Sequence, residues 1–321
     1  MKKYLLLIVF AAITGMVNAQ QDPQFTNWMF DRISFNPAAA GMDRLHCLTV
    51  FHRDQWDGFN GDPKTYLLNY NGYLQVGYNK SQLLGVGLSA YTEVLGKETN
   101  NVVRLAGAYH KNLGASTLSV GVHLGMVNKS LGAKWNPIDQ GDATIPTAAV
   151  SSMALDANIG VMLYQPGKYY AGLSATHLPA ANLYDVNVKL ARHYYLMGGY
   201  EYPLDGTDIT LRANALVKTS LKSKMSADLN VNALWNNMVW GGLSFRPGDA
   251  IAPMLGFQTC KTSQVNKTTE MTNCFKIGYS YDITTSDIKD YSAGSHEIFL
   301  SACLGINKLP LRMKYSNPRF L

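Results

Sequence analysis

Charged residues are scarce in this 321-residue chain: they make up only 16% of it, against about a quarter in ordinary globular proteins. Lys and Arg outnumber Asp and Glu by 28 to 22, but they are scattered singly and form no basic cluster. After residue 19 no apolar run approaches the roughly 18 residues that a membrane-spanning helix needs. These absences argue against a disordered chain, a helical membrane protein and a nucleic-acid-binding protein.

The residue spacings of common catalytic and metal sites are also missing. The seven histidines show no Glu-x-x-His or His-x-x-x-His spacing, and there is no Cys-x-x-Cys pair. The nearest approach to a catalytic group is Ser295-His296-Glu297, but adjacent side chains of a strand point to opposite faces. The sequence therefore predicts a protein that is not an enzyme and that holds no cofactor and no metal.

The N-terminus has the pattern of a secretion signal. Two lysines precede the apolar run at residues 5–13, and the small residues at 17–19 suit signal cleavage. No cysteine follows the predicted cut, so a lipid anchor is not indicated. We expect residues 1–19 to be a signal peptide and the mature, exported protein to begin at Gln20 or Gln21.

From Arg44 to Ile306 the apolar residues recur with a period of two. Residues 118–126, for example, alternate Leu, Val and Met with Ser, Gly and His. Repeated segments of about ten residues that alternate in this way are typical of a transmembrane antiparallel β-barrel, whose apolar side chains face lipid. A soluble β-sandwich or propeller also alternates and is the alternative fold. About fourteen strands are predicted, near 44–52, 64–72, 82–91, 101–111, 115–127, 153–165, 168–176, 189–201, 208–219, 225–233, 237–246, 250–260, 274–283 and 296–306.

The predicted connections are longer at one end of the barrel than at the other. Long loops at 53–63, 128–152, 177–188 and 284–295 follow odd-numbered strands, and most other turns are tight, which is the usual outside–inside asymmetry of these barrels. The predicted exception is a longer inner loop at 261–273. Aromatic residues near strand ends are predicted to form the interfacial girdles. They are Tyr169, Tyr170, Tyr194, Tyr195, Tyr200, Tyr202, Trp235 and Trp240.

One stretch before the first strand has a helical period instead. Asp22 suits a helix N-cap and Pro23 the first helical turn, and apolar residues follow at i, i+3, i+4 and i+8 from Phe25. We expect residues 20–41 to form a short, plug-like helical segment that closes the lumen or its periplasmic mouth. The candidate plug or partner residues are Asp22, Pro23, Phe25, Trp28, Met29, Ile33, Asn36 and Pro37.

The residues predicted to face the lumen carry both signs of charge. Burying charges without partners is costly, so mixed signs favour a filled, salt-bridged lumen. A porin is expected to have charge of one sign along its channel. The polar lumen candidates are Arg104, His123, Asp156, Arg212, Asp228 and Lys276.

Four cysteines remain in the mature chain. Cys47 and Cys303 lie in the first and last predicted strands, which become neighbours when a barrel closes. Cys260 and Cys274 lie at the two ends of the predicted loop 261–273. Both disulfides are possible in an oxidising compartment, and small apolar fillers are the equal alternative, because pairing cannot be deduced from sequence.

A series of short motifs runs through residues 20–306 in a fixed order. They are Gln21-Asp22-Pro23-Gln24-Phe25, Phe30, Asn36-Pro37-Ala38 with Gly41, Trp56 with Gly61-Asp62-Pro63-Lys64-Thr65, Asp156 near Gly160, Tyr169 to Ser174 with His177, Trp240-Gly241-Gly242 with Phe245-Arg246, Gly278 to Asp282, and Ser295 to Ile298. Each motif alone is weak, but their order and spacing are specific. Together they resemble the PorP/SprF proteins, outer-membrane components of the Bacteroidetes type IX secretion and gliding machinery.

This resemblance implies a fourteen-stranded barrel that is integral to the outer membrane. It implies a non-enzymatic role in docking or anchoring secreted cargo, such as large gliding-type adhesins with C-terminal sorting domains. The implied partners are the type IX translocon, periplasmic secretion components, the adhesin and outer-membrane lipid, with no nucleic acid. The alternative function is a channel or transporter for a small solute or lipid, with an N-terminal hatch.

The predicted domain boundaries follow from these patterns. After the signal peptide and the plug-like segment, the barrel is expected at 42–306. A basic tail is expected at 307–321, where four Lys and Arg residues lie among prolines. This tail is interpreted either as an anchor for a periplasmic partner or as a solvated extension.

Overall fold

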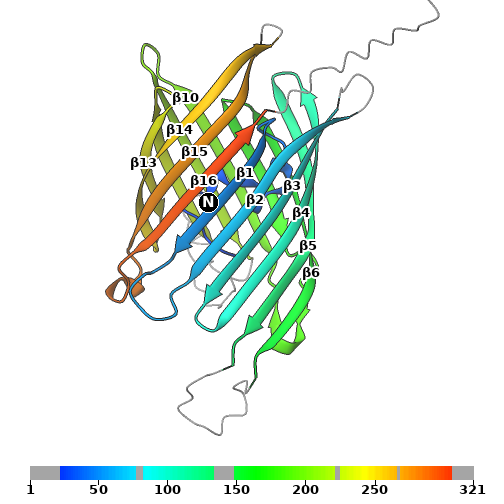
Figure 1. The fold of residues 1–321 in the computed structure, drawn as a ribbon, viewed down its shortest axis with the longest axis vertical. Coiled ribbons are helices and arrows are strands. Elements are labelled where there is room, and N and C mark those ends of the chain that lie inside the picture. Colours follow the sequence, from blue (N-terminus) through cyan, green and yellow to red (C-terminus); the bar gives the residue numbers. More distant parts are fainter. Residues whose placement is uncertain (1–21, 77–81, 134–147, 221–224, 266–267, 306–321) are drawn as a thin grey trace, which may run out of the picture.

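The computed structural model describes residues 22–76, 82–133, 148–220, 225–265 and 268–305, so the predicted signal peptide and C-terminal tail lie outside the described residues. Fourteen antiparallel strands form a closed barrel, which confirms the predicted fold (Figure 1). Each strand pairs with its neighbours along the chain, and the last strand pairs with the first. The barrel strands are β1 (His46–Asp54), β2 (Lys64–Val76), β3 (Gln82–Leu95), β4 (Glu98–Leu113), β5 (Ser116–Leu131), β6 (Val150–Gln165), β7 (Tyr169–Thr176), β10 (His193–Pro203), β11 (Ile209–Thr219), β12 (Ser226–Trp235), β13 (Val239–Arg246), β14 (Ala250–Val265), β15 (Thr268–Thr284) and β16 (Ser295–Leu304).

The outer and inner faces of the wall carry different side chains. In β6 the outward Leu155 is 73% exposed, whereas the inward Asp156 and Asn158 are buried. The same alternation gives the barrel an apolar outer surface, which suits contact with lipid. No helix within the described ranges is both long and apolar enough to cross a membrane.

The two ends of the barrel differ in the length of their connections. The long-loop end carries 55–63, 177–192 and 285–294, and the short-turn end carries 114–115, 166–168 and 204–208. The loop 177–192 contains the small sheet of β8 (Asn182–Leu183) and β9 (Val188–Lys189), joined by η4 (Tyr184–Val186). The 3-10 turn η5 (Asp287–Asp290) lies in 285–294.

The longer inner loop predicted at 261–273 is wrong. β14 and β15 continue their ladder to Val265 and Thr268, with one register shift between Lys261 and Thr262. Several threonines occur in this stretch, and β-branched residues favour the extended conformation even when the segment is polar.

The prediction that all eight aromatic residues form girdles is also wrong for part of the set. Tyr170, Tyr195 and Trp240 are buried on the inner side of the wall, whereas Trp235 is 60% exposed and Tyr200 is 47% exposed. Aromatic residues next to each other in a strand point to opposite faces, so pairs of adjacent tyrosines cannot both face lipid.

Residues 22–45, here called the lead segment, run through the lumen from the long-loop end to the short-turn end before β1 begins (Figure 1). The predicted helical segment is found only as short helical turns. The segment contains only η1 (Trp28–Phe30), α2 (Arg32–Phe35) and η2 (Pro37–Ala39), and no side chain caps η1 or α2. The barrel wall surrounds the segment, so its backbone groups find partners there instead of within a helix.

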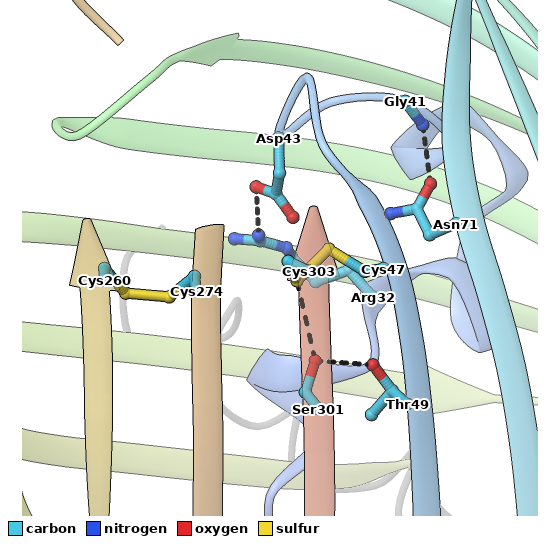
Figure 2. Close-up of a disulfide and its surroundings, with 10 residues drawn as sticks. All are labelled: Arg32, Gly41, Asp43, Cys47, Thr49, Asn71, Cys260, Cys274, Ser301 and Cys303. Atoms are coloured by element: carbon cyan, nitrogen blue, oxygen red, sulfur yellow. Dashed lines mark hydrogen bonds and ion pairs between the residues drawn. A yellow bond between two sulfur atoms is a disulfide. The ribbon is translucent and has the colours of Figure 1, made fainter. Parts of the chain in front are cut away.

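Two disulfides lie toward the short-turn end (Figure 2). Cys47 and Cys303 join β1 to β16 and therefore close the barrel covalently at the seam between the first and last strands. Cys260 and Cys274 join the neighbouring strands β14 and β15. Beside the seam, the hydroxyl groups of two inward residues on β1 and β16 are 2.8 Å apart.

Candidate functional site

The short-turn half of the lead segment lies directly against the backbone of the wall. A Cβ atom on Gly85 of β3 would be 1.8 Å from the carbonyl oxygen of Ala40. A Cβ atom on Gly121 of β5 would be 2.5 Å from the amide nitrogen of Ala38. No side chain fits at either position, so two wall glycines and a run of alanines make this approach possible.

Wall side chains also satisfy the carbonyl groups of this half. The hydroxyl of Ser119 donates to the Ala38 carbonyl over 2.8 Å, and that of Ser174 donates to the Phe35 carbonyl over 2.6 Å. In the opposite direction, Asn36 Nδ2 donates to backbone carbonyls of both β6 and β7 over 3.1 and 3.2 Å. Buried backbone groups need such partners, and these contacts fix the segment without a regular helix.

The long-loop half of the lead segment is held by charged side chains. Arg53 is 2.7 Å from a carboxylate oxygen of Asp282 and 3.0 Å from one of Glu297. Glu297 accepts hydrogen bonds from the backbone amides of Thr26 and Asn27 over 2.8 and 2.7 Å. The carboxylate of Glu297 therefore links the wall arginine to the backbone of the lead segment.

An aromatic layer lies between the two halves. The Phe30 ring centroid is 5.0 Å from that of Trp240 and 4.7 Å from that of Phe299. The cationic groups of Arg212 and Lys276 lie 5.7 and 5.9 Å from the same Phe30 centroid. Two inward-facing cations are thus placed against an aromatic face of the lead segment, where the ring quadrupole attracts them.

A second ionic cluster joins the start of the lead segment to the loop 177–192. His177 Nε2 is 2.8 Å from Asp22 Oδ1, and His177 Nδ1 is 3.0 Å from Asp156 Oδ1. Arg104 Nε donates to the other oxygen of Asp156 over 2.9 Å, and the Tyr195 hydroxyl donates to Asp22 Oδ2 over 2.8 Å. Asp22 therefore binds the wall and does not cap a helix.

The electrostatic environment keeps both members of the Asp22–His177 pair charged at neutral pH. Burial opposes the charge of Asp22, but His177 and His193 outweigh it and hold the pKa of Asp22 well below its usual value. Burial also opposes the charge of His177, but Asp22 and Asp156 outweigh it and raise its pKa to about 9.

Asp31 differs from Asp22 in that its pKa is raised instead of lowered. Burial is the largest cause and raises its pKa to about 8, although hydrogen bonds from Ser34 and Asn69 partly oppose the shift. Asp31 is therefore mostly protonated at neutral pH, whereas Asp22 is ionised.

A chamber of about 750 Å³ lies at the long-loop end, above the start of the lead segment. Its floor includes Asp22 and Pro23, and its walls come from strand ends and loops around the barrel mouth. Its charged lining has both signs, so it does not select for one sign of ligand. The charged residues of the chamber include Asp22, Glu93, Glu98, Lys129, Arg246 and Asp249.

The structure places all six polar lumen candidates on the inner face of the wall. Asp228 and His123 also have partners there. Asp228 accepts a hydrogen bond from Arg246, and His123 Nδ1 is 3.2 Å from the Asn158 amide. The apolar plug candidates are buried in the lumen. They are Phe25, Trp28, Met29, Ile33 and Pro37.

Sequence reasoning missed Arg53, His177 and His193 as parts of the site. Alternation along β1 could have marked Arg53 as inward, because it continues the series Cys47, Thr49 and Phe51. His177 belongs to one of the family-like motifs, but no spacing connects either histidine with Asp22, which lies 155 positions from His177 in the sequence.

The side chains of Ser295 and His296 lie on opposite faces of the wall. Ser295 is buried inside and accepts a hydrogen bond from the Trp56 amide over 3.0 Å. His296 pairs with the Tyr279 hydroxyl on the other face over 2.7 Å. The two side chains therefore do not form a nucleophile and its base.

The closed barrel and its apolar outer face define an outer-membrane β-barrel. The monoaromatic hydrocarbon channel CymD is similar in structure, with a TM-score of 0.50 and 10% identity over 89% of this chain and 94% of that one. Omp33, an outer-membrane protein of Acinetobacter baumannii, has a TM-score of 0.41 and 8% identity over 82% and 99% of the two chains. At these identities the likeness concerns the fold alone.

The sequence matches the family described as type IX secretion system membrane protein PorP/SprF over residues 17–302. The chain belongs to this family, which confirms the resemblance of its motifs, and it is an outer-membrane protein of the type IX secretion machinery. The family is defined by a role in secretion and not by an enzyme activity. No curated protein matches the chain.

Proposed function

We propose that this barrel is a docking site that holds secreted cargo, such as an adhesin with a C-terminal sorting domain, at the outer membrane. The proposal rests on one observation: the backbone of the lead segment is hydrogen-bonded to side chains of the wall along the lumen. A barrel filled in this way offers a fixed surface in the membrane instead of an open path. Family membership in the secretion machinery supports a protein partner.

The long-loop end is the proposed docking surface. Long loops face outward in barrels of this type, and the chamber of about 750 Å³ opens among them. Its mixed charges suit a polypeptide segment that carries both acidic and basic groups, since complementary charges give specificity and register more than raw affinity. Glu93, which lines this chamber, is a suitable position to test the contact.

The test is a mild-detergent pull-down of the tagged protein from native outer membranes, followed by mass spectrometry. We expect type IX translocon proteins or a large surface adhesin to be recovered with the barrel. Recovery of the barrel alone, together with steady single-channel conductance in a lipid bilayer, would overturn the proposal in favour of a channel with an N-terminal hatch.

A pair of charge reversals locates the contact. Glu93→Lys changes the chamber, and Asp205→Lys makes the same change on an exposed turn at the opposite end of the barrel. We expect Glu93→Lys to reduce recovery of the cargo and Asp205→Lys to leave it unchanged. Equal loss in both variants would contradict docking at the long-loop end.

A further inference from the structure

Three side chains with metal-ligand atoms meet on the floor of the chamber. Asp22 comes from the lead segment, His177 from the loop after β7, and His193 from the start of β10. One ligand atom from each lies within 4.8 Å of the others. Residues far apart in the sequence are thus brought to one point that the chamber reaches.

The spacing of these atoms is close to what a metal ion requires. Two ligands at about 2.0–2.2 Å from a tetrahedral ion lie about 3.3–3.6 Å apart. His193 Nδ1 is 3.6 Å from Asp22 Oδ2, which already matches. His177 Nε2 is 2.8 Å from Asp22 Oδ1, so this pair must separate by less than about 1 Å to admit the ion.

The outer partners of His177 also fit a metal ligand. A ligating histidine usually donates its second ring nitrogen to a carboxylate, which fixes the ring and raises the basicity of the ligand. Here His177 Nδ1 is 3.0 Å from Asp156 Oδ1, and Asp156 is itself held by Arg104 at 2.9 Å. This arrangement directs His177 Nε2 toward Asp22 and the chamber.

The donor set selects the kind of ion. Two imidazole nitrogens and one carboxylate oxygen suit Zn²⁺, Cu²⁺ or Ni²⁺, whereas Ca²⁺ and Mg²⁺ prefer sites made of oxygen alone. The side chains of Asp22, His177 and His193 are 17%, 5% and 10% exposed, so the ligands are sheltered while the chamber gives access.

We propose that Asp22, His177 and His193 bind one divalent transition-metal ion of the zinc class. The ion replaces the proton on His177 Nε2 that faces Asp22, and this proton leaves through the chamber. Because the three ligands come from the lead segment, a loop and a wall strand, the bound ion cross-links the lead segment to the barrel wall. The site goes beyond the docking role, since it holds the lead segment in place whatever partner the barrel binds.

The test is isothermal titration of the detergent-solubilised, chelator-stripped protein with Zn²⁺, using an affinity tag without histidines. We expect one Zn²⁺ per chain. Asp22→Asn and His193→Gln should each weaken Zn²⁺ binding more than about 10-fold. Loss of a residue that only hydrogen-bonds a metal ligand already lowers metal affinity by about 10-fold or more. His296→Gln, which changes a histidine on the other face of the wall, should leave the affinity unchanged.

Two further readouts separate loss of a ligand from misfolding. The electron paramagnetic resonance spectrum of bound Cu²⁺ should show two imidazole nitrogens in the wild type and one in His193→Gln. Zn²⁺ should raise the Tm of the wild type and of His296→Gln but not that of His193→Gln. Absence of a bound equivalent in the wild type, or equal binding by His193→Gln and His296→Gln, would overturn the proposal.

Discussion

The two halves of the lead segment are held in the lumen by different forces. Near the short-turn end, the backbone at Ala38 and Ala40 touches wall glycines, and wall hydroxyl groups bond its carbonyls. Near the long-loop end, Arg53 and Glu297 form an ionic network that reaches the backbone amides of the segment. The first half depends on shape, and the second depends on charge.

Because of this difference, the attachment of the short-turn half, here called the base, is mainly steric, whereas the attachment of the long-loop half responds to pH and to bound cations. Steric contact between backbones does not itself change with pH or ions. The base also has a titratable contact, since His110 Nε2 lies 2.7 Å from the Ala40 carbonyl oxygen. Ionic contacts change with protonation and with bound cations. The end that faces the proposed docking surface is therefore the end whose attachment can be adjusted.

The largest expected effect comes from filling the close approach at the base. In Gly85→Val, the new side chain meets the Ala40 carbonyl, where even a Cβ atom would be only 1.8 Å away. We expect destabilisation well above the roughly 1–3 kcal/mol of ordinary overpacking, and greater than that caused by loss of a disulfide or of a buried ion-pair partner, because backbone must move. Thermal unfolding and the heat-dependent gel mobility of the barrel measure it.

The matched control is Gly107→Val on the neighbouring strand β4. Gly107 faces outward, and a Cβ atom there would meet nothing within 4 Å. We expect this variant to fold and unfold like the wild type. Equal destabilisation by both valines would mean that the effect comes from the strands and not from the lead segment.

The seam disulfide is expected to have the next largest effect and to add to the stability of the base. Cys47–Cys303 closes a separation of 256 residues, and Cys260–Cys274 one of 14. The chain-entropy relation gives about 5.5 kcal/mol for the first and about 3 kcal/mol for the second. Paired Cys→Ala variants, compared by urea unfolding, should rank in this order, and the reverse order would contradict it.

At the long-loop end, Arg53→Met should strongly weaken the ionic network. It leaves Glu297 buried without its cation and Asp282 with only Arg246, 3.6 Å away, and removing one partner of a buried pair typically costs about 3–5 kcal/mol. Lys64→Met is the control, because it removes an exposed cation 3.7 Å from Asp54, and exposed pairs contribute little. Urea unfolding compares the two variants, and a small effect of Arg53→Met would mean that charge does not hold this half.

The pH dependence of stability should show the contribution of Asp31, because burial opposes its ionised form. The pKa of Asp31 is about 8 in the folded protein and about 4 in an unfolded chain. Its contribution to stability is complete below about pH 4 and is lost as the pH rises through 8, with a slope of at most about 1.4 kcal/mol per pH unit. Asp31→Asn should flatten this decline in urea unfolding at about pH 5 and about pH 9. An unchanged slope would contradict the assignment.

The barrel could be predicted because its signal is repeated and local. Each strand alternates, so residues such as Arg104 and Asp156 reveal their inward direction from their own neighbours. The lead segment could not be predicted in the same way. Its apolar period indicated a helix, but the segment is surrounded by wall, and donors such as Ser119 and Ser174 replace the hydrogen bonds of a helix.

The ionic sites depend on contacts that only the closed barrel creates. Asp22 and His177 are 155 positions apart, and Asn27 and Glu297 are 270 apart. No spacing rule connects them, so neither the ionic network nor the histidine cluster is visible before the strands are in register. The wall topology and the inward-facing residues were therefore predictable, and the partners that these residues find inside the lumen were not.

The most direct test of the account is single-channel conductance of the wild type beside a variant that lacks residues 21–41, with heat-dependent gel mobility as the check that both barrels are folded. The account predicts no steady conductance comparable to an open porin for the wild type, and a large rise for the deletion variant. Porin-like conductance of the wild type, or no change on deletion, would contradict the claim that the lead segment fills the lumen of a docking barrel.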